Sequence, residues 1–225
     1  MKKVALGCGV VVATAFVALV SFAMRTPDLP PGFVSVRESS TFQAPALLER
    51  AWALPVAATY PRPLLSQTNP TGCGPTSVAN LLRSGGDATS QASQVAAHGA
   101  VCVWGFCFGG LTLDGLAEAA RQTSPGWKVS VVRPATVNAL RDQLRRANDP
   151  GVRLVANFHR FPLFGTGGGH HSPIGGYLEA EDLVFVLDVN ASYGPWLVPT
   201  DRLFEAMDTV DSGSGSKRGL ISFER

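Results

Sequence analysis

The chain has 225 residues, of which 45% are hydrophobic and 16% charged, and its formal net charge is +2 at pH 7. This composition is typical of a globular domain with a real core. No run of five Lys or Arg residues is present, so the sequence lacks the electrostatic footprint of a nucleic-acid-binding protein and we expect no such partner.

The N-terminus begins with two lysines, followed by an uncharged, largely apolar run over residues 4–24 that has small residues near Ala23. This pattern predicts either a signal peptide over residues 1–23 or an uncleaved membrane anchor, because about 20 apolar residues can cross a bilayer. We therefore expect an exported protein, periplasmic or membrane-anchored, that meets a membrane only through this segment. Residues 24–45 carry Pro, Gly, Ser and Thr and predict a loose arm.

The remaining residues, 46–225, are predicted to form one domain whose first half is mainly helical. Apolar spacing and helix-ending Gly and Pro residues predict helices over 45–53, 75–83, 90–97, 113–120 and 134–146. Pro134 is expected in the first turn of the last of these helices, and a strand over 127–132 precedes it.

The second half of the domain is rich in predicted strands. They cover residues 152–158, 170–177, 183–189 and 220–223, with a short helix over 201–207. Helices first and an antiparallel sheet second predict an α+β fold. That order suits a thiol enzyme whose nucleophile lies on the helical half and whose base lies on the sheet.

The first chemical motif lies around Cys73. Cys73 directly precedes a predicted helix whose Pro75 suits a first turn, and a helix N-terminus stabilises a thiolate. Gly72 and Gly74 are expected to let a substrate backbone approach closely. Gln67, six residues upstream, is placed to point its amide at the same position, where it would form an oxyanion hole with the Cys73 backbone N–H.

A thiol nucleophile needs a base, and the sequence contains four histidines: His98, His159, His170 and His171. The first two end a predicted helix and a predicted strand, where structural roles are common. The last two are neighbours on a strand and should face opposite ways, so we expect only one to meet Cys73; spacing alone does not choose between them.

The base in turn needs an acceptor that orients its ring. Asp188 and Asn190 lie at the end of the next strand, and either would hold an imidazole tautomer. Asp188 follows the strongly apolar run 183–187, which favours a buried partner for its carboxylate.

A longer segment, Gly169-His-His-Ser-Pro-Ile-Gly-Gly-Tyr177, resembles the Gly-His-Phe-Ser-Pro-Ile-Gly-Gly-Tyr segment of phytochelatin synthases. The spacing from Gln67 to Cys73-Gly74 resembles that family's Gln-x5-Cys-Gly, and the likeness extends over residues 60–210. It implies a papain-like fold with Cys73 as nucleophile, Gln67 as oxyanion donor, His170 as base and Asp188 as the residue that orients it.

The resemblance also implies an activity. The substrate would be glutathione, from which Cys73 removes glycine through a γ-glutamylcysteinyl thioester, with water or a second glutathione as acceptor. No cofactor would be required, and cadmium or zinc would act in a metal–glutathione substrate or as an activator in metal detoxification. Two differences stand out: His171 replaces the family's Phe, and Ala191 stands where plant members have Arg.

Two alternatives remain open. Cys73-Gly-Pro-Thr-Ser77 also resembles the double-glycine-processing peptidases, which share the papain-like arrangement. A non-enzymatic module would instead use Cys102, Cys107 and the two neighbouring histidines to bind a metal. In an exported protein Cys102 and Cys107 would either form a disulfide, leaving Cys73 free, or remain buried and reduced.

Overall fold

The computed structural model describes residues 29–225 except 100–101, 104–105 and 108–109. It divides the chain into Met1–Phe33 and Val34–Arg225, and the fold below is that of the second unit. The expected leader, residues 1–23, lies outside the described residues. Among the residues described, no helix combines the length and apolar character needed to cross a membrane.

The helices of Val34–Arg225 follow the predicted order, with one short addition. They are α2 (Pro45–Trp52), α3 (Cys73–Ser84), α4 (Ala92–Ala96), α5 (Leu113–Thr123), α6 (Val137–Arg146), α7 (Phe161–Phe164) and α8 (Thr200–Met207), with 3-10 turns η1 (Val36–Glu38), η2 (Ala57–Thr59) and η3 (Glu179–Glu181).

One predicted helix start is wrong. α6 does not begin at Pro134, because the Thr136 hydroxyl accepts a hydrogen bond from the Ala139 N–H at 3.1 Å and caps the helix there.

The strands form one antiparallel sheet of six and a two-stranded ladder. The sheet order is β3 (Lys128–Val132), β8 (Gly219–Glu224), β4 (Val152–His159), β5 (Gly169–Leu178), β6 (Leu183–Leu187) and β7 (Pro195–Pro199). The ladder pairs β1 (Cys102–Val103) with β2 (Phe106–Cys107). The sequence did not predict β7 or the ladder, while its helix-then-sheet order is confirmed as an α+β fold.

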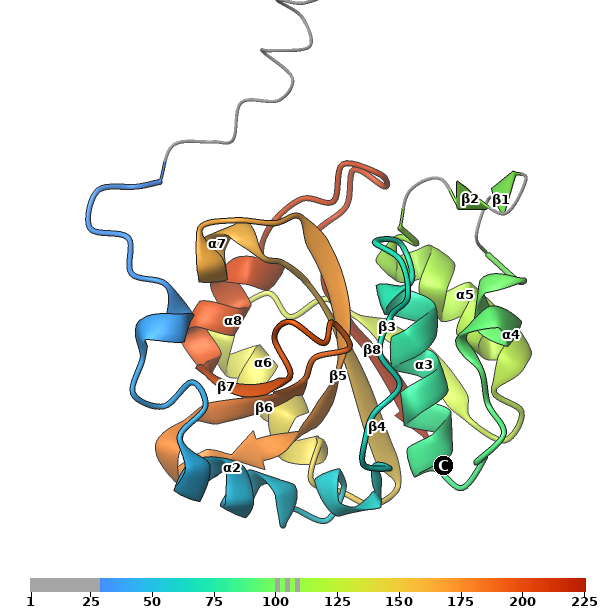
Figure 1. The fold of residues 1–225 in the computed structure, drawn as a ribbon, viewed down its shortest axis with the longest axis horizontal. Coiled ribbons are helices and arrows are strands. Elements are labelled where there is room, and N and C mark those ends of the chain that lie inside the picture. Colours follow the sequence, from blue (N-terminus) through green and yellow to red (C-terminus); the bar gives the residue numbers. More distant parts are fainter. Residues whose placement is uncertain (1–28, 100–101, 104–105, 108–109) are drawn as a thin grey trace, which may run out of the picture. The chain divides into compact units, whose positions relative to one another are not determined.

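Helices cover both faces of the sheet because strand residues alternate between two cores. On β4, Val155 packs with the α3–α5 side, whereas Leu154 and Phe158 join the core beneath α6 and α8. Figure 1 shows α3 and α5 on one face and α6 and α8 on the other. This arrangement sets the first turn of α3 against β5, where the site is formed.

Part of the predicted arm packs against the sheet. Val36 and Phe42 are both buried in the core that includes β4 and α8. The Phe42 ring stacks on Trp196 of β7 with centroids 5.7 Å apart. Of the arm expected over residues 24–45, the portion from Val34 onward therefore belongs to the folded unit.

Candidate active site

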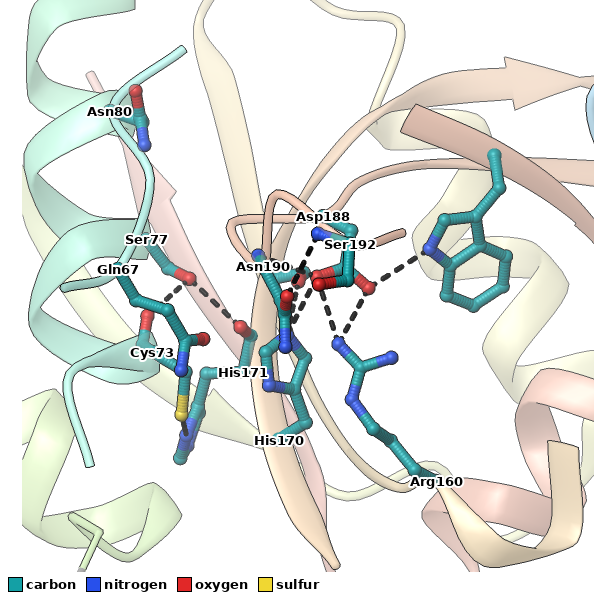
Figure 2. Close-up of polar contacts among 12 residues, drawn as sticks. Gln67, Cys73, Ser77, Asn80, Arg160, His170, His171, Asp188, Asn190 and Ser192 are labelled. Carbon is teal, nitrogen blue, oxygen red and sulfur yellow. Dashed lines mark hydrogen bonds and ion pairs between the residues drawn. The ribbon is translucent and has the colours of Figure 1, made fainter. Parts of the chain in front are cut away.

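Cys73 is the first residue of α3 and its thiol is buried, with 5% of the residue exposed. The Ser77 hydroxyl, one turn later, lies 2.7 Å from the Cys73 carbonyl oxygen and 3.0 Å from that of His171. It therefore ties the start of α3 to β5 (Figure 2). Gly74 does not leave room for a substrate as expected, because a Cβ there would lie 3.0 Å from the Leu116 side chain of α5.

Gln67 lies on an extended segment that two contacts hold beside α3 and β6. The Asn80 amide of α3 bonds both backbone groups of Leu65, at 2.8 and 2.9 Å. The Gln67 N–H donates to the Val189 carbonyl at 2.8 Å. Its side-chain amide donates one hydrogen to Asn69 O at 2.9 Å, and Figure 2 shows this amide pointing toward Cys73. The second amide hydrogen is free of partners among the described residues and suits an oxyanion.

His170 and Asp188 meet as the sequence predicts. The His170 Nε2 lies 3.0 Å from Asp188 Oδ1 and 3.0 Å from the Ser172 hydroxyl, and its ring packs edge-on against Phe158. In Figure 2 the His170 ring lies between Cys73 and Asp188. The alternative acceptor, Asn190, contributes only its backbone N–H, which donates to Asp188 Oδ1 at 2.9 Å.

The sequence did not predict the other partners of Asp188. Arg160 Nη2 lies 2.9 and 2.8 Å from the two carboxylate oxygens, and the Trp196 indole N–H donates to Oδ2 at 3.0 Å. The Arg160 guanidinium is itself stacked 3.7 Å from the centre of the Tyr193 ring. Since both ions are almost fully buried, Arg160 keeps the carboxylate charged and fixed in place.

His171 overturns one expectation. Its Nδ1 lies 3.9 Å from Cys73 Sγ, within hydrogen-bond distance of the thiol, whereas the predicted base His170 acts on Cys73 by lowering the pKa of the thiol. Figure 2 shows the His171 ring in contact with Cys73 and the His170 ring turned toward Asp188, so the expectation that only His170 meets the thiol is wrong. The remaining histidines are structural as predicted: His98 is exposed, and His159 accepts the Phe161 N–H at 3.2 Å.

The protonation states follow from these contacts. Burial raises the pKa of the Cys73 thiol, but hydrogen bonds and charge from His170 and His171 outweigh burial and hold the pKa well below its usual range. Burial lowers the pKa of His170, yet the bonds to Asp188 and Cys73 leave that pKa raised. Both pKa shifts favour the charged forms, a thiolate at Cys73 and an imidazolium at His170.

A polar cavity of about 190 Å³ opens beside the thiol, lined by Cys73, His171, Asn157, Gly169, Asp211 and Arg218, among others. Arg218 is 6% exposed and donates to Asp211 at 3.1 Å and to Asn157 at 3.4 Å. Its Nε–H has no partner among the described residues. The cavity therefore places a buried cation, paired with Asp211 and with one N–H that has no partner among the described residues, next to Cys73.

A family model described as phytochelatin synthase matches residues 106–220, which include His170, Asp188 and Arg218. The chain belongs to the phytochelatin synthase family. The residues matched by the family model do not include Cys73 and Gln67. The fold brings these two residues against the matched half of the chain. The resemblance in the sequence is thus confirmed at the level of the family.

Curated relatives with this family's activity name include plant proteins. Glutathione gamma-glutamylcysteinyltransferase 1 of Triticum aestivum is 39% identical over 92 residues, which are 40% of this chain and 18% of that protein. Glutathione gamma-glutamylcysteinyltransferase 3 of Lotus japonicus is 36% identical over 114 residues, 50% of this chain and 24% of that protein. The match therefore spans about a quarter or less of each phytochelatin synthase relative.

Among solved structures, a putative C39-like peptidase from Bacillus anthracis is similar, with a TM-score of 0.51 and 17% identity. The alignment covers 72% of this chain and 94% of that one. At this identity the likeness speaks for the fold alone, and it confirms the papain-like architecture expected of this phytochelatin synthase family member.

The expected metal module and the disulfide question both concern Cys102 and Cys107, whose side chains lie outside the described residues. Within the described part of the chain, no group of three or more His, Cys, Asp or Glu side chains is arranged to hold a metal ion. The functional residues that sequence reasoning missed are Arg160, Asn157 and Arg218. Arg160 stands in Phe158-His-Arg160, which resembles the family only loosely, and Arg218 carries no motif.

Proposed function

We propose that this protein is a thiol acyltransferase and hydrolase acting on glutathione, from which it removes glycine to give γ-glutamylcysteine. The observation that carries the proposal is the buried Cys73 thiol at the start of α3, with His171 Nδ1 at 3.9 Å and the His170–Asp188 pair beside it. Membership of the phytochelatin synthase family supports glutathione as the substrate.

In the acylation step, the Cys73 thiolate attacks the carbonyl carbon between the Cys and Gly residues of glutathione. The negative charge that develops on the carbonyl oxygen is stabilised by the Gln67 amide and the Cys73 backbone N–H. The C–N bond then breaks and the imidazolium of His170 gives its proton to the departing glycine amine. A γ-glutamylcysteinyl thioester remains on Cys73.

The cavity beside Cys73 supports a substrate orientation in which the γ-glutamyl half lies next to the thiol. A γ-glutamyl group carries both a carboxylate and an ammonium, and the cavity presents the buried Arg218 guanidinium and its partner Asp211 to them. His171 and Asn157 line the same cavity with further polar atoms. Ala191 carries no charge at the position where plant members have Arg, so Arg218 is the cation that would hold the acyl half of the substrate.

In the second step neutral His170 takes a proton from water, which attacks the thioester and releases γ-glutamylcysteine. We propose that this hydrolysis exceeds transfer to a second glutathione, because transfer needs a surface that holds an acceptor against water at about 55 M. Cadmium or zinc would enter as a metal–glutathione complex, with no cofactor needed. The apolar N-terminal segment supports an exported enzyme.

The test is to incubate the full-length chain with several millimolar glutathione, with and without cadmium, and to identify products by mass spectrometry. We expect glycine and γ-glutamylcysteine in equal amounts, and no products from Cys73→Ser. Absence of both products would exclude the proposal. Phytochelatins of two or more repeats in excess of γ-glutamylcysteine would leave the acylation step standing and disprove the dominance of hydrolysis.

A further inference from the structure

A second, apolar pocket lies between the segment before Gln67 and the segment from Asp188 to Pro195. It measures about 260 Å³ and is lined by Trp52, Pro63, Leu64, Ala191 and Pro195, with Arg62 at its edge. The volume is just below the ~300 Å³ at which small-molecule pockets begin, which suits one amino-acid residue better than a peptide.

Two of its lining residues adjoin the catalytic groups directly. Ser66 precedes Gln67, whose N–H donates to the Val189 carbonyl, and Asp188 binds His170. The pocket is therefore lined by the residue before the oxyanion donor and by the partner of the base. The polar cavity, in contrast, is lined by Cys73 and His171.

A peptide bond that is cut at Cys73 has its acyl half on one side of the carbonyl carbon and its amine on the other. The acyl half must stay beside the sulfur that it acylates, which is where the polar cavity lies. The amine must leave toward the group that protonates it, and His170 lies between Cys73 and Asp188 (Figure 2). The apolar pocket bordered by Asp188 is thus on the leaving-group side.

The chemistry of this pocket does not match glycine. Glycine has no side chain to fill walls made by an indole ring, two prolines and a leucine. The Arg62 guanidinium stacks 3.9 Å from the centre of the Trp52 ring and has no carboxylate partner among the described residues. A free carboxylate beside an apolar side chain would satisfy both features.

We propose that this pocket binds the leaving residue of the substrate and selects an apolar amino acid with a free carboxylate over glycine. The preferred substrate is then a γ-glutamylcysteinyl peptide ending in a residue such as leucine or phenylalanine. This inference rests on the proposed function. The bond changes are those given above: the thioester C–S bond forms, the C–N bond breaks, and the apolar amino acid leaves with the proton from His170.

The experiment compares kcat/KM for glutathione with that for γ-Glu-Cys-Leu and γ-Glu-Cys-Phe, by measuring the free amino acid released. We expect at least one apolar peptide to exceed glutathione by about 10-fold or more, since such contacts in a pocket discriminate by about 10–200-fold. Glutathione cleaved as well as or better than both would overturn the inference and leave the proposed function intact. No cleavage of any of the three would overturn both.

Two variants of pocket residues test whether the preference for an apolar leaving residue comes from this pocket. Ala191 is exposed at the pocket wall, so Ala191→Leu should fill the pocket without disturbing the core, and should lower kcat/KM for the apolar peptides while sparing glutathione. Arg62→Gln should lower kcat/KM for γ-Glu-Cys-Leu but not kcat/KM for the C-terminal amide of this peptide. Arg225 provides the matched control, since it stacks 4.0 Å from Trp127 away from the site and Arg225→Gln should change neither substrate. An unchanged preference in both pocket variants would contradict the assignment.

Discussion

The carboxylate end and the thiol end of the site are held very differently. Asp188 accepts hydrogen bonds from four groups at 3.0 Å or less: the side chains of His170, Arg160 and Trp196 and the Asn190 backbone N–H. Each of these donors is fixed by packing or by its own strand. The position of the base is therefore built into the fold before any substrate arrives.

The thiol end is held by fewer contacts. Cys73 Sγ has His171 at 3.9 Å and an open polar cavity beside it, and the side-chain amide oxygen of Gln67 is buried without a partner among the described residues. The difference indicates two separate roles. The carboxylate end sets the protonation state of His170, and the thiol end adapts to the substrate. The predictions below test this division.

The largest effect is expected at the thiol itself. Cys73→Ser should lower kcat/KM by about 10⁴-fold or more, because the imidazoles that stabilise a thiolate do not ionise a hydroxyl to the same extent. Circular dichroism and thermal unfolding should show a folded protein, since the change is nearly isosteric. A folded serine variant with near-normal turnover would remove Cys73 from the mechanism.

The two neighbouring histidines form a natural matched pair. His170→Ala should be inactive, because it removes the link between Cys73 and Asp188, whereas His171→Ala should retain substantial activity. Steady-state kinetics on both variants show which histidine is the base, and near-UV circular dichroism checks that each variant is folded. The opposite ranking would mean that His171 is the base and that Asp188 serves another purpose.

Gln67→Ala tests the thiol end of the site. It should lower kcat by about 100–1000-fold, as loss of one oxyanion donor typically does, with little change in stability. Asn69→Ala is a suitable control, since it keeps the backbone carbonyl to which Gln67 donates. If kcat is unchanged in the Gln67 variant, the oxyanion must be held by other donors.

Asp188→Asn should lower activity less than His170→Ala does, because the amide oxygen still accepts from His170, as in Cys-His-Asn sites. Stability should fall by about 3–5 kcal/mol, since Arg160 becomes an unpaired buried charge. Chemical denaturation measures this loss. Adding Arg160→Met should restore part of the stability without restoring activity, and failure of that rescue would show that the ion pair is not the cause.

The smallest effect is on the pH profile of kcat/KM. The thiolate is lost when pH falls below the lowered pKa of Cys73, and the imidazolium is lost when pH rises above the raised pKa of His170. A bell-shaped profile is expected. Because Asp188 helps to raise the pKa of His170, Asp188→Asn should move the alkaline limb to lower pH and leave the acid limb nearly unchanged. A shift of the acid limb alone would reverse this assignment.

Local patterns were sufficient to predict the elements that carry the triad. A helix starting just after Cys73, a strand beginning near His170 and an acid at the end of the next strand all follow from short-range signals; in the structure the helix starts two residues earlier than predicted, at Cys73 itself. Arg160 and Arg218 could not be assigned this way, because each reaches the site only through sheet pairing with distant segments. The approach of His171 to the thiol depends on where α3 meets β5, which no spacing rule specifies.

The stacking of Phe42 on Trp196 has a practical consequence for anyone shortening this chain. Trp196 holds Asp188 through its indole N–H, and Phe42 covers one face of that indole. A chain trimmed to start at residue 46, the domain boundary that the sequence suggests, would lose this cover while keeping every catalytic side chain. The N-terminal limit of the working enzyme therefore lies upstream of Phe42, and the stretch that looks like a linker is the outer support of the catalytic carboxylate.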